Sequence, residues 1–114
     1  MKLPLSAFII CQDEERFIEP CIRSLGMCSE IVVVDSGSTD RTLEILAALK
    51  DEGFPLLILS EKWRGYGGQK QFAMERCTEP WCLSIDSDER VSPHLAAELP
   101  RLRAYVHKAG LTVE

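Results

Sequence analysis

Several features common in small binding and redox proteins are missing from this chain. Its 114 residues carry a net charge of −5, so it lacks the basic excess that nucleic-acid-binding domains usually show. No C-x-x-C pair occurs among its five cysteines, although zinc sites usually need ligands spaced that closely. We therefore expect no nucleic-acid partner and no zinc site. We interpret the cysteines in or beside apolar segments as reduced core thiols of a cytoplasmic protein; they are Cys11, Cys21, Cys28 and Cys82.

Long hydrophobic runs and glycine-rich phosphate loops are missing too. No apolar run approaches the roughly 20 residues of a membrane-spanning helix, and the segment KLPLSAFIIC lacks the cleavage pattern of a signal peptide. The chain contains neither the G-x-G-x-x-G fingerprint of dinucleotide-binding folds nor a G-x-x-x-x-G-K-[ST] loop. The segment after the first apolar run is instead the acidic CQDEER. These absences leave one small globular domain, or part of a larger one.

The apolar residues that are present fall into four short runs separated by amphipathic segments. The runs cover residues 5–11, 31–35, 56–59 and 81–86. Each is short and almost continuously apolar, as strands buried on both faces of a sheet are. The second run, IVVVD, is the clearest, because β-branched residues favour strands. We therefore predict four buried strands.

Helical spacing of apolar residues predicts a helix after each strand. The first three helices are expected at about residues 18–25, 39–52 and 68–76, and a fourth is expected to begin at Ser92. Alternating strands and helices imply an α/β fold with a mostly parallel sheet covered by helices on both faces. The buried stripe of the second helix is predicted to be Leu43, Leu46, Ala47 and Leu49.

Acidic residues stand at the ends of two predicted strands, Asp35 after the second and Asp86 at the end of the fourth. The carboxyl ends of parallel strands meet at one sheet edge, where ligands of such folds bind. A tight turn and a helix cap explain residues 37–40, but they leave Asp35 unexplained, because a buried unpaired carboxylate is costly. We therefore expect both acids on a ligand-binding edge.

The segment SIDSDER places Asp88 two positions after Asp86. Two carboxylates in one turn repel each other unless a cation lies between them, and hard oxygen ligands suit Mg²⁺ or Mn²⁺. Such ions usually keep open positions that substrate phosphates fill. The pattern predicts a divalent-cation site, and its alternative is a solvated acidic turn ahead of the last helix.

Three segments taken together are more specific than any one of them. They are SAFIICQDEERFIEPCIRSL, EIVVVDSGSTDRTLEI and GYGGQKQFAMERCTEPWCLSIDSDERVSP. In order, spacing and residue type they resemble the family 2 glycosyltransferases over roughly residues 4–100, and the third is most similar to the lipopolysaccharide core enzymes of that family. The resemblance implies the Rossmann-like GT-A fold and transfer of a sugar from a nucleotide-diphosphate donor. The expected nucleotide is UDP, and the expected cofactor is Mn²⁺ or Mg²⁺.

The resemblance also implies roles for individual residues. Asp35 matches the aspartate that holds the nucleotide base, Asp86 lies on the ribose side, and Asp88 ligates the metal that bridges the diphosphate. The end of the first strand lines the base pocket. Trp63 and Tyr66, which precede the third helix, either flank the donor or are ordinary loop packing. The predicted donor-binding residues are Cys11, Asp13, Glu15, Asp35, Lys70 and Asp86, and the predicted metal ligand is Asp88.

A general base that deprotonates the acceptor hydroxyl is not found after Asp88, where the remaining acids are Glu89, Glu98 and Glu114. Members of the resembled family place this base beyond the D-x-D segment. We therefore expect residues 1–114 to form the donor-binding half of a truncated GT-A domain, with an unknown catalytic base. A nucleotide-sugar-binding fragment without transferase activity is the main alternative. A nucleotidyltransferase is disfavoured because the basic glycine-rich loop is missing, and a plain structural module leaves two acid-tipped strands without a purpose.

The acceptor implied by the resemblance is a saccharide or a lipid-linked saccharide. The basic run RLRAYVHK leaves peripheral contact with the cytoplasmic face of the inner membrane open. Self-association is also open, because a truncated sheet exposes apolar surface.

Overall fold

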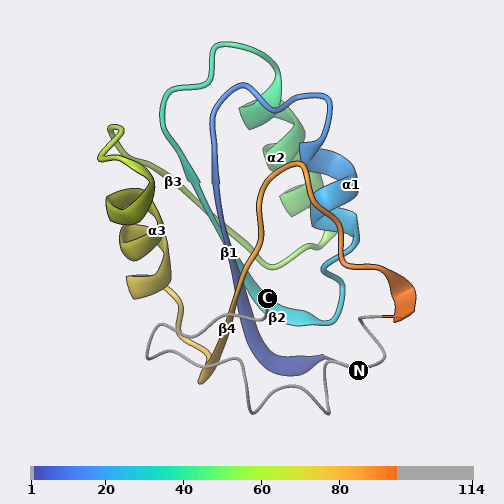
Figure 1. The fold of residues 1–114 in the computed structure, drawn as a ribbon. Coiled ribbons are helices and arrows are strands. Elements are labelled where there is room, and N and C mark those ends of the chain that lie inside the picture. Colours follow the sequence, from blue (N-terminus) through green and yellow to red (C-terminus); the bar gives the residue numbers. More distant parts are fainter. Residues whose placement is uncertain (1, 95–114) are drawn as a thin grey trace.

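The computed structural model describes residues 2–94 as one parallel sheet flanked by helices (Figure 1). The strands lie in the order β3-β2-β1-β4, and every neighbouring pair is parallel. This arrangement confirms the predicted α/β fold. The strands are β1 (Leu3–Cys11), β2 (Cys28–Asp35), β3 (Leu56–Ser60) and β4 (Trp81–Ser84), and the helices are α1 (Ile18–Arg23), α2 (Thr42–Glu52) and α3 (Tyr66–Glu75).

Helices cover both faces of this sheet, with α1 and α2 on one side and α3 on the other (Figure 1). Alternate residues along the central strands therefore enter two separate cores. Ile9 and Val33 pack in the cluster that includes α1 and α2 residues, whereas Phe8 and Val34 pack in the cluster that includes α3 residues. Full burial of each such side chain stabilises the fold by about 1.5–3 kcal/mol, which explains why the strands are apolar on both faces.

The buried stripe of α2 differs from the prediction. Thr42, Leu46 and Leu49 are buried, and Ile45 packs beside them. These positions follow the i, i+3, i+4, i+7 spacing of one helix face. Leu43 is 39% exposed and Ala47 is exposed, so their prediction as core residues was wrong. The spacing of apolar residues predicted that the buried face begins at Leu43. In the structure it begins one residue earlier, at the polar Thr42.

Two predicted boundaries also shift. β4 ends at Ser84, so Asp86 lies in the following loop rather than in the strand. The amide of Ile85 still donates to the Phe8 carbonyl at 3.2 Å, and the chain then turns away from the sheet. Helix α3 begins at Tyr66, directly after Gly65, whose φ is 86°. The helix therefore begins two residues before the predicted start at residue 68, and Gly67 and Gly68 lie in its first turn.

All five cysteines lie among the described residues and are buried and free of disulfides, as expected of core thiols. Pro93 and His94 have helical backbone, and the rest of the predicted fourth helix lies outside the described residues. Within residues 2–94, none of the helices has the length and apolar character needed to cross a membrane.

Candidate functional site

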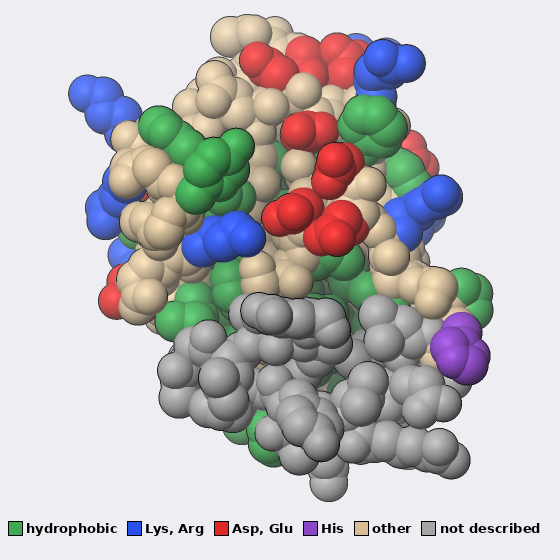
Figure 2. Space-filling model, viewed as in Figure 1, with side chains coloured by type: hydrophobic (Ala, Val, Ile, Leu, Met, Phe, Trp, Pro, Cys, Tyr) green, Lys and Arg blue, Asp and Glu red, His purple; other side chains and the backbone are tan. Residues whose placement is uncertain are grey.

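A cleft of about 720 Å³ opens at the carboxyl edge of the sheet. Its volume lies within the range of ordinary small-molecule sites. Acidic side chains gather over the loops at this end of the molecule (Figure 2). The lining residues come from the end of β1, from the loops that follow all four strands and from the first residue of α3: Ile10, Cys11, Gln12, Glu14, Ser36, Lys62, Trp63, Tyr66, Asp86, Ser87 and Asp88.

One wall of the cleft is the acidic turn that follows β4. Asp86 and Asp88 are exposed, and Ser87 between them is buried. The Glu89 carboxylate accepts a hydrogen bond from the Asp86 amide at 2.8 Å, and the Glu89 amide donates to the Asp86 carbonyl at 2.9 Å. The Lys70 ammonium of α3 lies 3.6 Å from the Asp86 carboxylate. Glu89 therefore stabilises the shape of the turn, and Lys70 offsets part of its negative charge.

Residues of α1 and of its C-terminal end contact the backbone of this turn and of the segment after it. The Cys21 thiol lies 3.7 Å from the Asp86 carbonyl, and the Ser24 hydroxyl accepts a hydrogen bond from the Val91 amide at 3.0 Å. Burial, and then the negative charges of Glu89 and its neighbours in the turn, raise the pKa of Cys21 to about 12. Cys21 is therefore a neutral thiol near pH 7 and serves as packing.

The chemistry of the turn fits a hard divalent cation. Within residues 2–94, no group of three or more His, Cys, Asp or Glu side chains forms a ready-made metal cage. Asp86 and Asp88 nevertheless present exposed carboxylates to the same cleft. Mg²⁺-type sites in enzymes commonly use one or two carboxylates and complete their coordination with water and substrate phosphates. The two carboxylates of Asp86 and Asp88 therefore suit a cation whose remaining coordination positions are filled by the phosphates of a ligand.

Asp35 lies beneath the cleft rather than in its lining. Its side chain is buried, with 1% of the residue exposed. One carboxylate oxygen accepts hydrogen bonds from the amides of Gly37 at 3.0 Å and Ser38 at 2.9 Å, and the Ser38 hydroxyl donates to the other oxygen. The Cys11 thiol lies 3.5 Å from that second oxygen. Burial and then the charge of Asp35 raise the pKa of Cys11 above its ordinary value. The turn itself thus satisfies the Asp35 carboxylate.

Asp13 and Glu15 connect two loops at the same edge. Asp13 has a positive φ of 56°, and its carboxylate accepts hydrogen bonds from the amides of Thr39 at 2.8 Å and Asp40 at 3.3 Å. The Glu15 amide donates to the Asp40 carboxylate at 3.1 Å. These bonds hold the loop after β1 against the loop after β2. Neither Asp13 nor Glu15 lines the cleft.

The sequence profile of glycosyl transferase family 2 matches residues 6–109. This chain belongs to that family. It is 55% identical over 103 residues to the lipopolysaccharide core biosynthesis glycosyltransferase LpsC of Rhizobium meliloti (strain 1021), which covers 90% of this chain and 38% of LpsC. An uncharacterized glycosyltransferase of Rickettsia bellii is 41% identical over 96 residues, 83% of this chain and 31% of that protein. The family 2 chain thus spans well under half the length of these relatives.

Solved structures show that the family 2 chain has the predicted GT-A fold. TarS residues 1–349 of S. aureus, in complex with UDP, superpose with a TM-score of 0.74 at 24% identity, covering 92% of this chain and 33% of TarS 1–349. The mannosyltransferase PcManGT of Pyrobaculum calidifontis, in complex with GDP-Man and Mn²⁺, gives a TM-score of 0.73 at 20% identity, covering 90% and 32%. At these identities the likeness establishes the fold alone.

The structure brings only some of the predicted site residues of this family 2 chain into the cleft. Cys11, Asp86 and Asp88 line it, and Lys70 reaches it through its contact with Asp86. Asp35, Asp13 and Glu15 are not among its lining residues. The donor contacts of all these residues, and metal binding by Asp88, stay predictions.

Lys62 is a lining residue that sequence reasoning missed. It follows β3, whose carboxyl end lies at the same edge of the parallel sheet as those of the other strands. The predicted third strand could therefore have indicated that the residues after it face the cleft. Trp63 and Tyr66 also line the cleft, and their rings pack edge to face at 5.0 Å. The side chain of Arg64, between them, instead pairs with Glu61. The two aromatic residues thus belong to the cleft rather than to loop packing alone.

Proposed function

We propose that this chain is the donor-binding part of a glycosyltransferase that transfers a sugar from a UDP-sugar to a saccharide or lipid-linked acceptor of the lipopolysaccharide core. The observation that carries the proposal is the cleft at the carboxyl edge, with Asp86 and Asp88 on one wall and Lys62 and Trp63 on another. Family membership and the identity to LpsC support the reaction class and its setting. The UDP in the TarS complex supports the choice of nucleotide.

Asp88 is the residue that would hold Mn²⁺ or Mg²⁺ together with the donor diphosphate, with Asp86 beside it on the ribose side of the donor. A cation at this position acts as a Lewis acid that stabilises the charge on the leaving diphosphate. Glu89 contributes by fixing the turn, because both of its short hydrogen bonds are to the backbone of Asp86. The turn is therefore organised before any ligand binds, which lowers the entropy lost on binding.

Lysine side chains supply positive charge at the same cleft. Lys62 lines it, and the Lys70 ammonium lies within ion-pair distance of Asp86. Ammonium groups bind phosphate oxygens as point charges. We place Lys70 beside the diphosphate, where it exchanges part of its contact with Asp86 for phosphate oxygens.

The nucleoside end of the donor is expected where β1 and β2 end. Ile10, Cys11 and Gln12 line the cleft there, with Ser36 from the adjacent turn. Asp35 is the predicted partner of the base, and its bonds to Gly37 and Ser38 hold the turn that carries Ser36.

Cytoplasmic location and contact with a membrane or a second copy also stay predictions. The catalytic base is unassigned: Glu89 is bonded to the Asp86 amide, and Glu98 and Glu114 lie outside the described residues.

Nucleotide binding is tested by thermal unfolding of the full chain with UDP, with Mn²⁺, and with both. The proposal predicts that UDP raises the melting temperature when Mn²⁺ is present, and that Asp88→Asn removes the metal-dependent part. Asp51→Asn is the matched control, because Asp51 is an exposed acid near the C-terminal end of α2 and does not line the cleft. A UDP effect that is absent, or indifferent to the metal, contradicts the donor site. Sugar transfer from UDP-sugar to a core acceptor then separates an active enzyme from a fragment that only binds the donor.

A further inference from the structure

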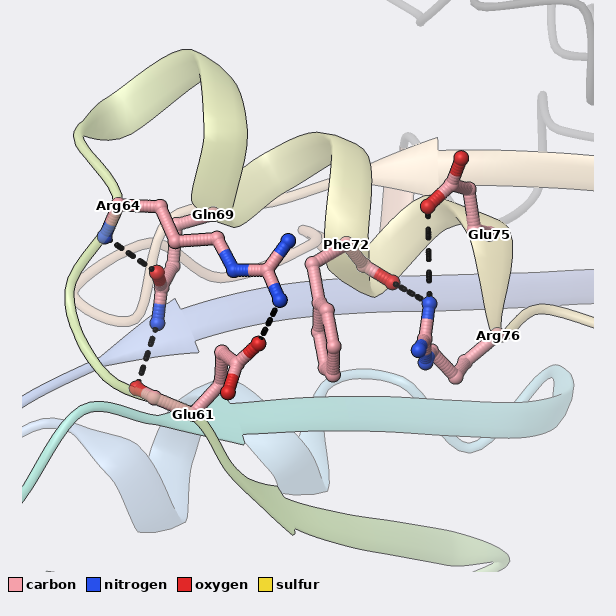
Figure 3. A network of polar contacts seen from close by, with 6 residues as sticks. All are labelled: Glu61, Arg64, Gln69, Phe72, Glu75 and Arg76. Carbon is pink, nitrogen blue, oxygen red and sulfur yellow. Dashed lines mark hydrogen bonds and ion pairs between the residues drawn. The ribbon is translucent and has the colours of Figure 1, made fainter.

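The loop between β3 and α3, residues 61–65, is closed by a buried side chain of α3. Gln69 is fully buried, and it is among the few polar side chains in the interior. Its amide oxygen accepts a hydrogen bond from the Arg64 amide at 3.1 Å, and its amide nitrogen donates to the Glu61 carbonyl at 3.1 Å. Figure 3 shows Gln69 bridging the two ends of the loop. Both polar ends of the Gln69 side chain are thus used by the backbone of one loop.

The side chains at the ends of this loop are held on the side of α3. Arg64 pairs with Glu61, and its guanidinium lies 4.8 Å from the centre of the Phe72 ring. Arg76 lies on the same ring at 3.6 Å, and Figure 3 shows Phe72 between the two arginines. The residues between Glu61 and Arg64 are Lys62 and Trp63, and these line the cleft.

Two glycines allow the loop to lie this close to α3. Gly65 has a φ of 86°, which non-glycine residues rarely adopt. A Cβ added to Gly68 would lie 3.0 Å from the Cβ of Arg64, whereas a Cβ on Gly67 would meet nothing within 4 Å. A side chain at Gly68 would therefore press on Arg64 of the loop, whereas one at Gly67 would not. The segment RGYGGQ, residues 64–69, thus contains the two glycines and the glutamine that hold the loop against the start of α3.

We propose that Gln69 is a positioning residue of the donor site: it fixes the β3–α3 loop so that Lys62 and Trp63 form one wall of the cleft before the nucleotide binds. This proposal rests on the proposed function. Its physical basis is that a buried amide with both ends bonded to the backbone has one low-energy orientation, since losing either bond leaves a buried polar group unsatisfied. Gln69 itself does not line the cleft.

The first experiment reads the loop without any nucleotide. In a Trp81→Phe background Trp63 is the only tryptophan of the chain, so its acrylamide quenching reports the loop. We expect Gln69→Ala to raise the quenching constant about twofold or more, because Trp63 is now only 49% exposed and the freed loop moves into solvent. Gln71→Ala is the matched control, since Gln71 is exposed on the same helix and its side chain donates to Glu75 at 3.4 Å rather than to the loop. Equal quenching in both variants overturns the positioning role.

The second experiment measures UDP affinity in the presence of Mn²⁺ by calorimetry. We expect Gln69→Ala to weaken binding about tenfold, because the loop must then be ordered on binding, and Gln71→Ala to bind as the wild type does. Gly68→Ala and Gly67→Ala form a second pair that keeps Gln69 and raises helix propensity equally. Only Gly68→Ala should weaken binding, and neither should lower the melting temperature.

These outcomes separate a positioning role from a loss of folding. If Gln69→Ala does not fold, the glycine pair decides, because an added Cβ would contact Arg64 at Gly68 and would meet nothing within 4 Å at Gly67. Wild-type affinity in both Gln69→Ala and Gly68→Ala overturns the inference while leaving the donor site intact. Failure of the wild-type chain to bind UDP with Mn²⁺ instead overturns the proposed function, and the positioning role with it.

Discussion

Two kinds of aspartate stand at the same edge of the sheet, and they differ in what surrounds them. Asp35 is buried and accepts hydrogen bonds from Gly37 and Ser38 of its own turn. Asp86 and Asp88 are exposed to the cleft. A buried carboxylate must be hydrogen-bonded because its desolvation is costly, whereas exposed carboxylates remain available to a cation. Asp35 therefore stabilises its own turn, whereas the carboxylates of Asp86 and Asp88 are accessible from the cleft.

The structural role of Asp35 is testable through stability. Asp35→Asn should lower the free energy of unfolding by about 2 kcal/mol, because hydrogen bonds to a charged acceptor are replaced by weaker neutral ones. Urea denaturation followed by circular dichroism measures the change. Asp51→Asn makes the same chemical change at an exposed position of α2 and should shift stability by less than about 0.5 kcal/mol. Similar effects of the two variants would show that the Asp35 bonds contribute little.

The cysteines make a second prediction at this scale. Burial raises the pKa of Cys28 to about 12, and burial first and neighbouring acids second raise those of Cys21 and Cys11. Reaction with thiol reagents needs the thiolate. At pH 8 the native chain should therefore be modified slowly, at a rate limited by opening of the fold, and all five cysteines should react at once in denaturant. Rapid modification of one thiol in the native state would contradict its burial.

At the scale of elements, the loops after β1 and β2 are joined through two aspartates. Asp13 accepts hydrogen bonds from the Thr39 and Asp40 amides, and Asp40 in turn accepts from the Thr42 amide at 2.9 Å and from the Thr42 hydroxyl at 2.6 Å. Asp40, one of the residues for which a cap was expected, thus bonds Thr42, the first residue of α2. These bonds join the two loops that contribute Gln12, Glu14 and Ser36 to the cleft lining, where we expect the nucleoside.

The pH dependence of stability tests this junction. Desolvation tends to raise the pKa of Asp40, but hydrogen bonds from Thr42 and Glu15 outweigh it and lower the pKa from 3.8. A carboxylate with a lowered folded-state pKa stabilises the fold above its unfolded-state pKa, and this contribution is lost as the pH falls through the folded value. The difference in unfolding free energy between the wild type and Asp40→Asn should therefore be largest above pH 4 or so and shrink below it. A difference that is constant with pH would contradict the assignment.

Much of the element-level structure could be predicted because it depends on local patterns. Four apolar runs gave four strands, and their parallel order placed Asp35 and Asp86 at one edge. The second-helix stripe was wrong because the polar Thr42 is buried through its bonds to Asp40, a contact between a loop and a helix. Lys62 and Gln69 were also missed. The position of Lys62 after β3 could have been inferred from strand order, whereas the bonds of Gln69 depend on how the loop folds back onto α3, which no periodicity in the sequence indicates.

At the scale of the whole molecule, the central claim is that a nucleoside diphosphate and a divalent cation bind at the carboxyl edge of this sheet. Every lining residue of the large cleft lies at or after a strand's carboxyl end. Toward the amino end of the sheet, Glu30 of β2 accepts hydrogen bonds from the Ser6 hydroxyl at 2.7 Å and from the Thr78 amide at 2.8 Å, and so joins β1, β2 and the segment before β4. We therefore expect the ligand in the cleft at the carboxyl edge.

The most direct test is an amide NMR titration of the full chain with UDP, first with Mg²⁺ and then with traces of Mn²⁺. Mg²⁺ and UDP should shift the signals of Asp86, Asp88 and the Trp63 indole. Paramagnetic Mn²⁺ should then broaden the Asp86 and Asp88 amides first, while Thr78 at the opposite edge keeps its intensity. Broadening that needs no UDP and centres on the acids of α1 and α2, or shifts that leave residues 86–88 unchanged, would contradict a donor site at this edge.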